Sequence, residues 1–328
     1  FINLRPDRNK TASADYTEKH SRMMLFFCRK IYRLKGCVTK MMFKNRERIW
    51  VAGAGGQVGR DFVRLLEKAE EVELIPTDIG DVDITDGDSV RLFMEMNRPE
   101  IIVNCVGMTD ILACEENKDD AFRINALGAR NLSVAARSFR SRMVQISTDD
   151  VFDGTTEQPY DEFDTPVPNS VYGKSKLAGE NFVRSIAPKY LILRSSWVYG
   201  EGKNFVMDVL RKIENGETIQ VEQGYASPTS ALEAARMILR LLEEEAYGTY
   251  HATCQGVCSR YEFARKIAQL SGKEAKIEEM AVRRNLLRPR YAVLDNLMLR
   301  ISGIEMMQPW EAALEEYIRG IRQNGKKS

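Results

Sequence analysis

Two side chains one helical turn apart have the chemistry of a proton-transfer site. Tyr172 and Lys176 occupy positions i and i+4, which places them one above the other on a single helix face. A phenol acts as an acid at neutral pH only where its anion is stabilised, and a nearby ammonium group provides that stabilisation. Because this spacing also arises by chance, a surface pair without a chemical role is the alternative.

The segment before this pair favours the functional reading. Residues 143–147 are largely apolar, as in a buried strand, and the segment ends in the hydroxyl side chains of Ser147 and Thr148. Ligands in α/β folds bind at the carboxyl ends of the strands, so these hydroxyl groups are expected beside a ligand. The chain has only two histidines, which leaves a carboxylate, a tyrosine or a lysine as the general acid or base.

Three glycines between a predicted strand and a predicted helix form a candidate phosphate loop. Gly53, Gly56 and Gly59 have the spacing GxxGxxG, with Gln57 and Val58 between the last two. Glycine is needed where the backbone approaches a pyrophosphate closely, and the N–H groups at the helix start attract the phosphate charge. Dinucleotide binding is therefore predicted, with glycines used only for packing as the alternative.

An acidic residue at the end of the next predicted strand indicates which dinucleotide is bound. Asp78 stands 19 residues after Gly59, the distance expected for a carboxylate on the adenosine ribose. That carboxylate would repel a 2′-phosphate, and no lysine or arginine occurs in residues 77–89, so NADH is favoured over NADPH. Asp83 and Ile84 either border the adenine or form a capped loop before the next helix.

The cysteines give no disulfide framework and no CxxC motif. Cys254 and Cys258 lie four residues apart, but only His20 and His251 are available as imidazole ligands, so free thiols are favoured over a zinc site. No metal site is predicted from the sequence. A requirement of the reaction for Mg²⁺ is left open.

The elements that must position these residues alternate along the first 200 residues. The predicted strands are almost wholly apolar, as in a parallel sheet covered on both faces. They lie at 49–52, 72–76, 101–106, 143–147 and 190–195, with helices at 62–66, 90–96, 119–139 and 171–186. Beyond Gly200 the pattern is less regular, with helices at 204–213, 232–244, 259–270 and 309–322 and a strand at 248–252.

These patterns predict an α/β fold, a Rossmann-type doubly wound parallel sheet with a smaller C-terminal substrate lobe. Residues 46–200 are expected to form the dinucleotide-binding Rossmann domain. Residues 201–328 are expected to form mainly the substrate-binding lobe, with some segments that return to the first domain. Residues 1–45 are expected to be a dispensable basic leader.

Composition excludes several classes of protein. The 328 residues are 44% hydrophobic and 29% charged, which is typical of a globular protein, and the net charge of +1 gives no electrostatic reason to expect nucleic acid. Residues 1–50 hold 13 lysines and arginines against 4 aspartates and glutamates, and a basic surface helix at 24–34 is the alternative to a leader. No apolar run is long enough to span a membrane, so a cytoplasmic protein is expected.

Ordered motifs over residues 47–322 resemble those of the dTDP-4-dehydrorhamnose reductase family of extended short-chain dehydrogenases/reductases. After the glycine loop, the matching segments are 103–105, 125–132, 147–154, 171–180, 194–200, 227–229, 288–289 and 294–296. The resemblance implies reduction of the C4 ketone of a nucleotide-activated 4-keto-6-deoxy sugar by NADH or NADPH. The favoured reaction is dTDP-4-dehydro-L-rhamnose to dTDP-L-rhamnose, a step in polysaccharide biosynthesis.

The resemblance also implies roles for individual residues. Tyr172 would protonate the developing alkoxide, Thr148 would hydrogen-bond the reacting oxygen, and Lys176 would hold the nicotinamide ribose and lower the pKa of Tyr172. The other implied cofactor contacts are Asn104, Cys105 and Val106, and the implied substrate contacts are Thr109, Val151, Phe152, Trp197, Asn204 and Arg288. Several residues have a structural alternative. For Thr148 it is a strand-end hydroxyl, for Asn104 and Asn125 a buried amide, and for Trp197 and Tyr199 core packing. Arg288 is expected on the diphosphate, with a salt bridge as its alternative.

The sugar side departs from the family pattern. Asp150 stands where the family has a tyrosine, Met108 where it has a histidine or tyrosine, and Leu112 where it has an aspartate; residues 223–226 also differ from its Asp-Gln-aromatic-Gly pattern. Two alternatives therefore stay open: a reductase of another nucleotide-linked keto-sugar, and a non-catalytic NAD(P)-binding regulatory subunit. The expected partner is a nucleotide sugar, without nucleic acid or membrane, and a homodimer is left open.

Overall fold

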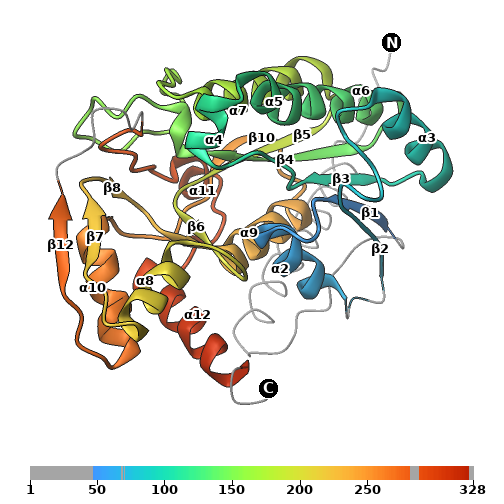
Figure 1. Ribbon diagram of the computed structural model, residues 1–328. Helices are drawn as coiled ribbons and strands as arrows, with labels where there is room; N and C mark the ends of the chain where they lie inside the picture. The colour runs from blue at the N-terminus through green and yellow to red at the C-terminus, as the bar shows by residue number, and fades with distance from the viewer. Residues whose placement is uncertain (1–46, 68, 70, 281–287, 325–328) are drawn as a thin grey trace, which may run out of the picture. The chain divides into compact units, whose positions relative to one another are not determined.

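Six parallel strands form the central sheet in the part of the chain that the structure describes (Figure 1). In this computed structural model the described residues are 47–67, 69, 71–280 and 288–324, so the predicted leader lies outside them. The strand order is β10-β5-β4-β3-β1-β2. The strands are β1 (Glu47–Ala52), β2 (Val72–Thr77), β3 (Ile101–Asn104), β4 (Arg142–Thr148), β5 (Tyr190–Ser195) and β10 (Gly248–His251).

The chain changes direction across the sheet at β1. β2 pairs with one edge of β1 and β3 with the other, so the connections to these two strands run to opposite sides. In a doubly wound sheet, ligands bind in the crevice outside the carboxyl ends of the strands at this reversal. The predicted Rossmann-type α/β class is confirmed, and the glycine loop and residue 105 both lie at this point.

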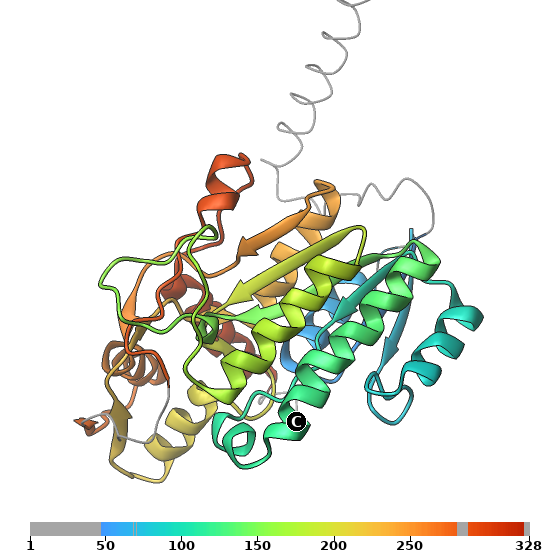
Figure 2. The same cartoon turned by 90° about the horizontal axis from the view of Figure 1, so that it is seen from above.

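Helices cover both faces of the sheet, as Figures 1 and 2 show. The helices α3 (Gly87–Asn97), α6 (Ala129–Phe139) and α7 (Val171–Ile186) pack side by side on one face. The helices α2 (Gln57–Leu66) and α9 (Ala231–Glu243) pack together on the other. The strands are apolar because both faces are buried, and Trp50, Ile102 and Met143 join Met94 and Leu132 in the core under the first group.

Most long helices begin at a side chain that satisfies a free N–H group. Asp86, Ser170 and Ser230 cap α3, α7 and α9 in this way. The helix α2 differs, because its N-cap is Gly56, no side chain caps it and its first turn holds no acidic residue. The start of α2 is therefore open to an anion that the protein itself does not supply.

From Val198 onward the chain builds short sheets and adds one strand, β10, to the large one. The short pairs are β6 (Val198–Tyr199) with β9 (Thr229–Ser230), β8 (Tyr225–Ala226) with β11 (Cys258–Ser259), and β7 (Ile219–Glu222) with β12 (Ile277–Met280). The helices of this part are α8 (Phe205–Glu214), α10 (Arg260–Ser271), α11 (Leu297–Ile301) and α12 (Trp310–Asn324). The strand β10 joins the edge of the Rossmann sheet, and the helix α9 packs on α2.

The structure refines one predicted helix. The segment expected as one helix over 119–139 consists of α5 (Lys118–Phe122), a π-helical segment (Arg123–Gly128) and α6, preceded by the short helix α4 (Ile111–Glu116). A π-helical insertion places an extra residue in the turn and often lies at functional sites. Here it holds the buried amide of Asn125. Within the described residues, no helix has the length and apolar character of a membrane span.

Candidate active site

The glycine loop after β1 has a backbone that other residues could not adopt. Gly53 has φ of +80°, and a Cβ atom there would lie 2.9 Å from the main-chain nitrogen of Val106. A Cβ atom on Gly59 would lie 2.2 Å from the carbonyl oxygen of Gly53. Glycine is therefore required at both positions. At Gly53 the loop approaches the backbone that follows β3, and at Gly59 it approaches its own backbone.

The uncapped start of α2 fits the pyrophosphate of a dinucleotide. The side chain of Gln57 turns away from it, donating from Nε2 to the carbonyl oxygen of Lys203 at 3.2 Å. The side chain of Val58 is buried in the core, so this residue offers only its N–H group to a ligand. Free N–H groups and the positive end of the helix dipole are the donor set that a phosphate requires.

Asp78 directly follows β2 and reaches the same loop. Its carboxylate accepts a hydrogen bond from the N–H of Gly55, at 2.9 Å to Oδ2 and 3.2 Å to Oδ1. A Cβ atom on Gly55 would lie 2.7 Å from Oδ2, so the carboxylate packs directly on the loop. The exposed position of Asp78 leaves its carboxylate accessible to a ligand beside the loop.

Asp83 and Ile84, the predicted neighbours of the adenine, lie in the loop between Asp78 and α3. The Asp83 side chain accepts from the N–H of Thr85 at 2.8 Å, and Asp86 caps the helix. Ile84 is buried in the core against Gly128, where an added Cβ would lie 2.6 Å from its Cδ1 atom. The capped-loop alternative accounts for these side-chain positions, and a contact with adenine stays a prediction.

Tyr172 and Lys176 are both buried on α7, which contradicts the alternative of a surface pair. Lys176 Nζ donates to the carbonyl oxygen of Ile146 on β4 at 2.6 Å. Burial lowers the pKa of Lys176 to about 8, and the nearby Glu180 carboxylate opposes this shift. The ammonium group is thereby fixed at the carboxyl half of β4.

The pKa of Tyr172 is raised rather than lowered. Burial is the largest cause, the carboxylate of Asp150 adds to it, and a hydrogen bond with Thr148 opposes it. Lys176 is not among the groups that mainly shift this pKa, so the expected lowering by its charge is not observed. The consequence is a phenol that stays protonated at neutral pH, the form in which it can donate a proton.

Thr148 links Tyr172 to a buried acid. Its Oγ1 lies 3.0 Å from Oδ1 of Asp149 and accepts the N–H of Asp150 at 3.2 Å. The other carboxylate oxygen of Asp149 accepts from Ser196 at 2.6 Å. Thr148 is therefore more than a strand-end hydroxyl, because its oxygen lies between the phenol and a carboxylate.

Two adjacent buried acids, Asp149 and Asp150, lie next to this hydroxyl. Burial raises the pKa of Asp149 to about 7, and the charge of Asp150 raises it further, while Arg288 opposes the shift. The pKa of Asp150 is also raised by burial and lowered by Arg288 and Arg260. Two carboxylates so close cannot both ionise easily, which adds to the effect of burial on the pKa of Asp149.

Buried amides order the loop that follows β3. Asn125 accepts from the N–H of Met108 at 2.8 Å and donates to the carbonyl of Met108 at 3.0 Å and to Ser175 at 2.9 Å. Asn104 donates to Gln145 at 2.8 Å and accepts from the N–H of Val106 at 3.1 Å. These bonds fix residues 104–108 between the glycine loop and α7.

Cys105 and Val106 lie in this ordered loop, between Gly53 and Lys176. Burial raises the pKa of the Cys105 thiol to about 12, and the nearby Lys176 charge opposes the shift. The thiol is therefore not a nucleophile at neutral pH. Cys254 and Cys258 are buried free thiols, as favoured from the sequence.

The predicted substrate contacts are placed in different surroundings. Val151 and Phe152 are fully buried in a cluster with Tyr160 and Leu294, so only their main-chain groups could reach a ligand. The Asn204 side chain caps α8 and donates to the carbonyl of Gly200 at 2.5 Å, so both of its polar atoms are engaged. Thr109 is exposed in the loop after β3.

Trp197 and Arg288 lie on the side of the site built by the C-terminal part. Trp197 is half-buried, has a φ of 41°, and carries the guanidinium group of Arg260 on its ring. Arg288 is exposed and forms no ion pair with the described residues, which does not support the salt-bridge alternative. Tyr199 is core, as its alternative held, and its ring lies 5.6 Å from that of Phe263.

Arg260 is the charged residue that sequence reasoning missed. It is the first residue of α10, and its partners come from distant segments, so neither its spacing nor a local motif marked it.

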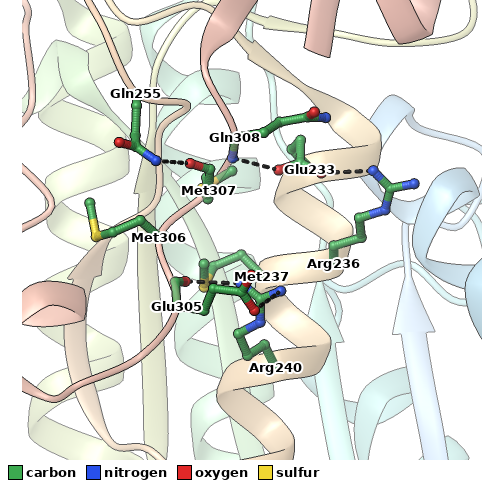
Figure 3. A pocket seen from close by; sticks show the side chains of 9 residues that line it. All are labelled: Glu233, Arg236, Met237, Arg240, Gln255, Glu305, Met306, Met307 and Gln308. Atoms are coloured by element: carbon green, nitrogen blue, oxygen red, sulfur yellow. Dashed lines mark hydrogen bonds and ion pairs between the residues drawn. The ribbon is translucent and has the colours of Figure 1, made fainter. Parts of the chain in front are cut away.

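A separate cavity of about 330 Å³ lies between α9 and residues 305–308 (Figure 3). Its charged side chains pair with one another: Arg236 binds Glu233 at 2.8 Å and Arg240 binds Glu305 at 3.2 Å. None of the predicted site residues lines it. The described residues also contain no group of three histidine, cysteine, aspartate or glutamate side chains placed to hold a metal ion.

Comparison with known proteins places this chain in one family. Residues 47–323 match the family model described as the RmlD substrate binding domain. A dTDP-4-dehydrorhamnose reductase of Clostridium acetobutylicum is 40% identical, with a TM-score of 0.80 over 84% of this chain and 99% of that one. The corresponding enzyme of Bacillus anthracis, solved in complex with NADP, is 37% identical with the same TM-score and coverage.

A dTDP-4-keto-6-deoxy-D-glucose reductase of Streptomyces niveus is 35% identical over 82% of this chain and 96% of its own length. The glycine loop and the pair Tyr172 and Lys176 are among the motifs by which the sequence resembles this family. The matches point to the same family. The chain belongs to the dTDP-4-dehydrorhamnose reductase (RmlD) family of extended short-chain dehydrogenases/reductases.

Proposed function

We propose that this chain catalyses the NAD(P)H-dependent reduction of the C4 ketone of a nucleotide-activated 4-keto-6-deoxy sugar, with dTDP-4-dehydro-L-rhamnose as its substrate. The observation that carries the proposal is the buried Tyr172, hydrogen-bonded to Thr148 at the end of β4 and one helical turn from Lys176. The names of the Clostridium and Bacillus anthracis relatives support this choice of substrate. A pure binding subunit would have no need of this set of groups.

The chain's own residues define how the dinucleotide would be held. The N–H groups of Gln57 and Val58 at the start of α2 would take the pyrophosphate, and Asp78 would take the adenosine ribose. Lys176 would hold the nicotinamide ribose, and the loop 104–106 would border the nicotinamide. When bound, the reduced nicotinamide supplies the hydride that reaches the carbonyl carbon.

Tyr172 would donate its proton to the sugar oxygen as negative charge develops there. Its raised pKa keeps the phenol protonated before the reaction, and Lys176 and Thr148 stabilise the phenolate afterwards. Thr148 Oγ1 can also hydrogen-bond the reacting oxygen. The Asp149 carboxylate accepts from this hydroxyl at 3.0 Å, and the main-chain N–H of Asp150 donates to it at 3.2 Å.

We further propose that NADH is preferred over NADPH. The Asp78 carboxylate already lies on the glycine loop, where it would meet the ribose hydroxyl groups and repel a 2′-phosphate. The Bacillus anthracis relative was solved with NADP, so the preference has to be measured on this chain. Arg288, exposed beside Asp149 and Asp150 and without an acidic partner among the described residues, would bind the substrate diphosphate.

The test is the loss of NADH absorbance with purified protein and a panel of nucleotide-linked 4-keto-6-deoxy sugars, repeated with NADPH. We expect turnover with dTDP-4-dehydro-L-rhamnose and a higher kcat/KM with NADH. Turnover only with another keto-sugar would favour the activity named for the Streptomyces niveus relative. NADH binding without reduction of any of them would overturn the proposal in favour of a regulatory subunit. A cytoplasmic location stays a prediction from the sequence, which left a homodimer and dependence on Mg²⁺ open.

A further inference from the structure

The guanidinium group of Arg260 is held by aromatic rings from two other segments. Its Cζ atom lies 3.5 Å from the ring centroid of Trp197 and 4.7 Å from that of Phe205. Phe263 supports both rings, with its centroid 6.4 Å from Trp197 and 5.6 Å from Phe205. Stacking fixes the guanidinium plane while its N–H donors stay available at the edge.

No described acid lies within ion-pair distance of this guanidinium group. Glu262, the nearest acid in the sequence, accepts from the N–H and the hydroxyl of Ser259 at 2.7 and 3.0 Å, and so completes the capping box of α10. Burial lowers the pKa of Arg260 to about 9, and the charge of Arg288 lowers it further. Asp149 and Asp150 oppose the shift from beyond salt-bridge distance.

Main-chain hydrogen bonds connect the start of α10 to the segment that carries Arg288. The N–H of Arg260 donates to the carbonyl of Gly224 at 3.1 Å, and the N–H of Tyr225 donates to the carbonyl of Arg290 at 2.9 Å. The dipeptide 224–225 therefore lies between the start of α10 and the segment that carries Arg288. A Cβ atom on Gly154 would lie 2.4 Å from Pro289, which packs that segment on residues 149–154.

The charges of Arg260 and Arg288 thus act on one another, and neither guanidinium group forms an ion pair among the described residues. Their mutual repulsion is relieved by a ligand with negative charge on several oxygens, and a guanidinium binds such oxygens through two parallel hydrogen bonds. Trp197, whose ring lies under Arg260, has a left-handed backbone with a φ of 41°.

We propose that Arg260 is a substrate-binding residue, which binds the phosphate oxygens of the nucleoside diphosphate together with Arg288 and is positioned by Trp197 and Phe205. The inference rests on the proposed function and extends it, because it adds a second cation to the diphosphate site. It also changes the role of Trp197, whose ring face is occupied by Arg260 and is not free to stack on the substrate.

The test compares Arg260→Gln and Arg260→Lys with the wild-type chain, with Arg265→Gln as the matched control. Arg265 lies on the same helix, is exposed, and has no ion pair among the described residues. Calorimetry measures the affinity for dTDP, and ligand-observed NMR measures binding of thymidine. NADH affinity and circular dichroism report whether each variant is folded.

We expect Arg260→Gln to weaken dTDP binding by about tenfold or more, equivalent to about 1.4 kcal/mol, with thymidine and NADH binding unchanged. Arg260→Lys should keep part of the affinity, since it retains the charge without the planar fork, and Arg265→Gln should match the wild type. Equal dTDP affinity in Arg260→Gln, or an equal loss of thymidine binding, would overturn the inference and leave the proposed function intact. If dTDP does not bind the wild-type chain, both fail together.

Discussion

Nζ of Lys176 donates a 2.6 Å hydrogen bond to the carbonyl oxygen of Ile146, which ties the ammonium group of α7 to the strand that ends at Thr148. The lysine is buried, so its position is set by β4 and not by solvent. Burial also brings its pKa down to about 8, close to the pH at which an enzyme works. The contact with Ile146 therefore sets the position of the ammonium group, and burial sets its pH response.

The first prediction concerns that pH response. A lysine is charged below its pKa, so the ammonium that stabilises the phenolate of Tyr172 is lost as the pH rises through about 8. The kcat/KM for the sugar should fall above that pH, measured in buffers of constant ionic strength. Lys174→Ala, at an exposed position on the same helix, should show the same profile. A profile that stays flat up to the pKa of free lysine would rule out this role.

The second prediction tests the glycine loop. In Gly59→Ala the new Cβ would lie 2.2 Å from the backbone oxygen of Gly53, and a backbone atom cannot move aside as a side chain can. Overpacking of this kind costs about 1–3 kcal/mol of stability, and NADH affinity should fall with it. Urea unfolding and NADH fluorescence titration measure the two effects. Gly320→Ala meets no atom within 4 Å and should leave NADH affinity unchanged.

The third prediction concerns the buried acid one turn beyond Lys176. Glu180 is fully buried and accepts from Arg194 at 2.9 Å and from Arg184 at 2.6 Å, contacts that lower its pKa against the opposing effect of burial. Glu180→Gln leaves Arg194 buried without its counter-charge, which should destabilise the fold by about 3–5 kcal/mol in urea unfolding.

Glu315→Gln is the control for Glu180, because its ion pair with Arg319 is exposed and should contribute about 0–1 kcal/mol. A carboxyl with a lowered pKa stabilises the fold above its unfolded pKa of about 4.3, and this contribution is lost as the pH falls through the folded value. The gap between Glu180→Gln and wild type should therefore narrow in acid. Equal stability of the two variants at neutral pH would show that the Glu180 contacts are not important to the fold.

Much of this fold could be predicted from local patterns. The apolar strands and the glycine spacing identified the sheet and the phosphate loop because both depend on short stretches of sequence. Tyr172 and Lys176 could be paired because their spacing alone places them on one helix face. The two-residue strands of the C-terminal part are too short to show a period, so none was predicted.

The residues that were missed depend on contacts between distant segments. Arg260 lies on the ring of Trp197 and near Arg288, and no local pattern relates positions 197, 260 and 288. The pKa of Tyr172 was expected to be lowered by Lys176, but burial and the acids 149 and 150 raise it. Burial of these acids is a tertiary property, since acidic residues are normally exposed.

The fourth prediction concerns the choice of cofactor. Asp78→Asn keeps the size of the side chain and removes the charge that would repel a 2′-phosphate, so the ratio of kcat/KM for NADPH to that for NADH should rise by about tenfold, equivalent to about 1.4 kcal/mol. Asp81→Asn serves as the control, because Asp81 accepts the N–H of Asp78 at 2.9 Å without touching the glycine loop. An unchanged ratio in Asp78→Asn would contradict the assigned role of Asp78.

The central claim is that Tyr172 donates the proton in a hydride-transfer reaction, and the most direct test is the rate of NADH oxidation with dTDP-4-dehydro-L-rhamnose in Tyr172→Phe. The variant lacks only the hydroxyl group, so the fold and NADH affinity should match the wild type. We predict a fall in kcat of roughly 100- to 10,000-fold, the range for loss of a general acid. Turnover at the wild-type rate in Tyr172→Phe would contradict the account.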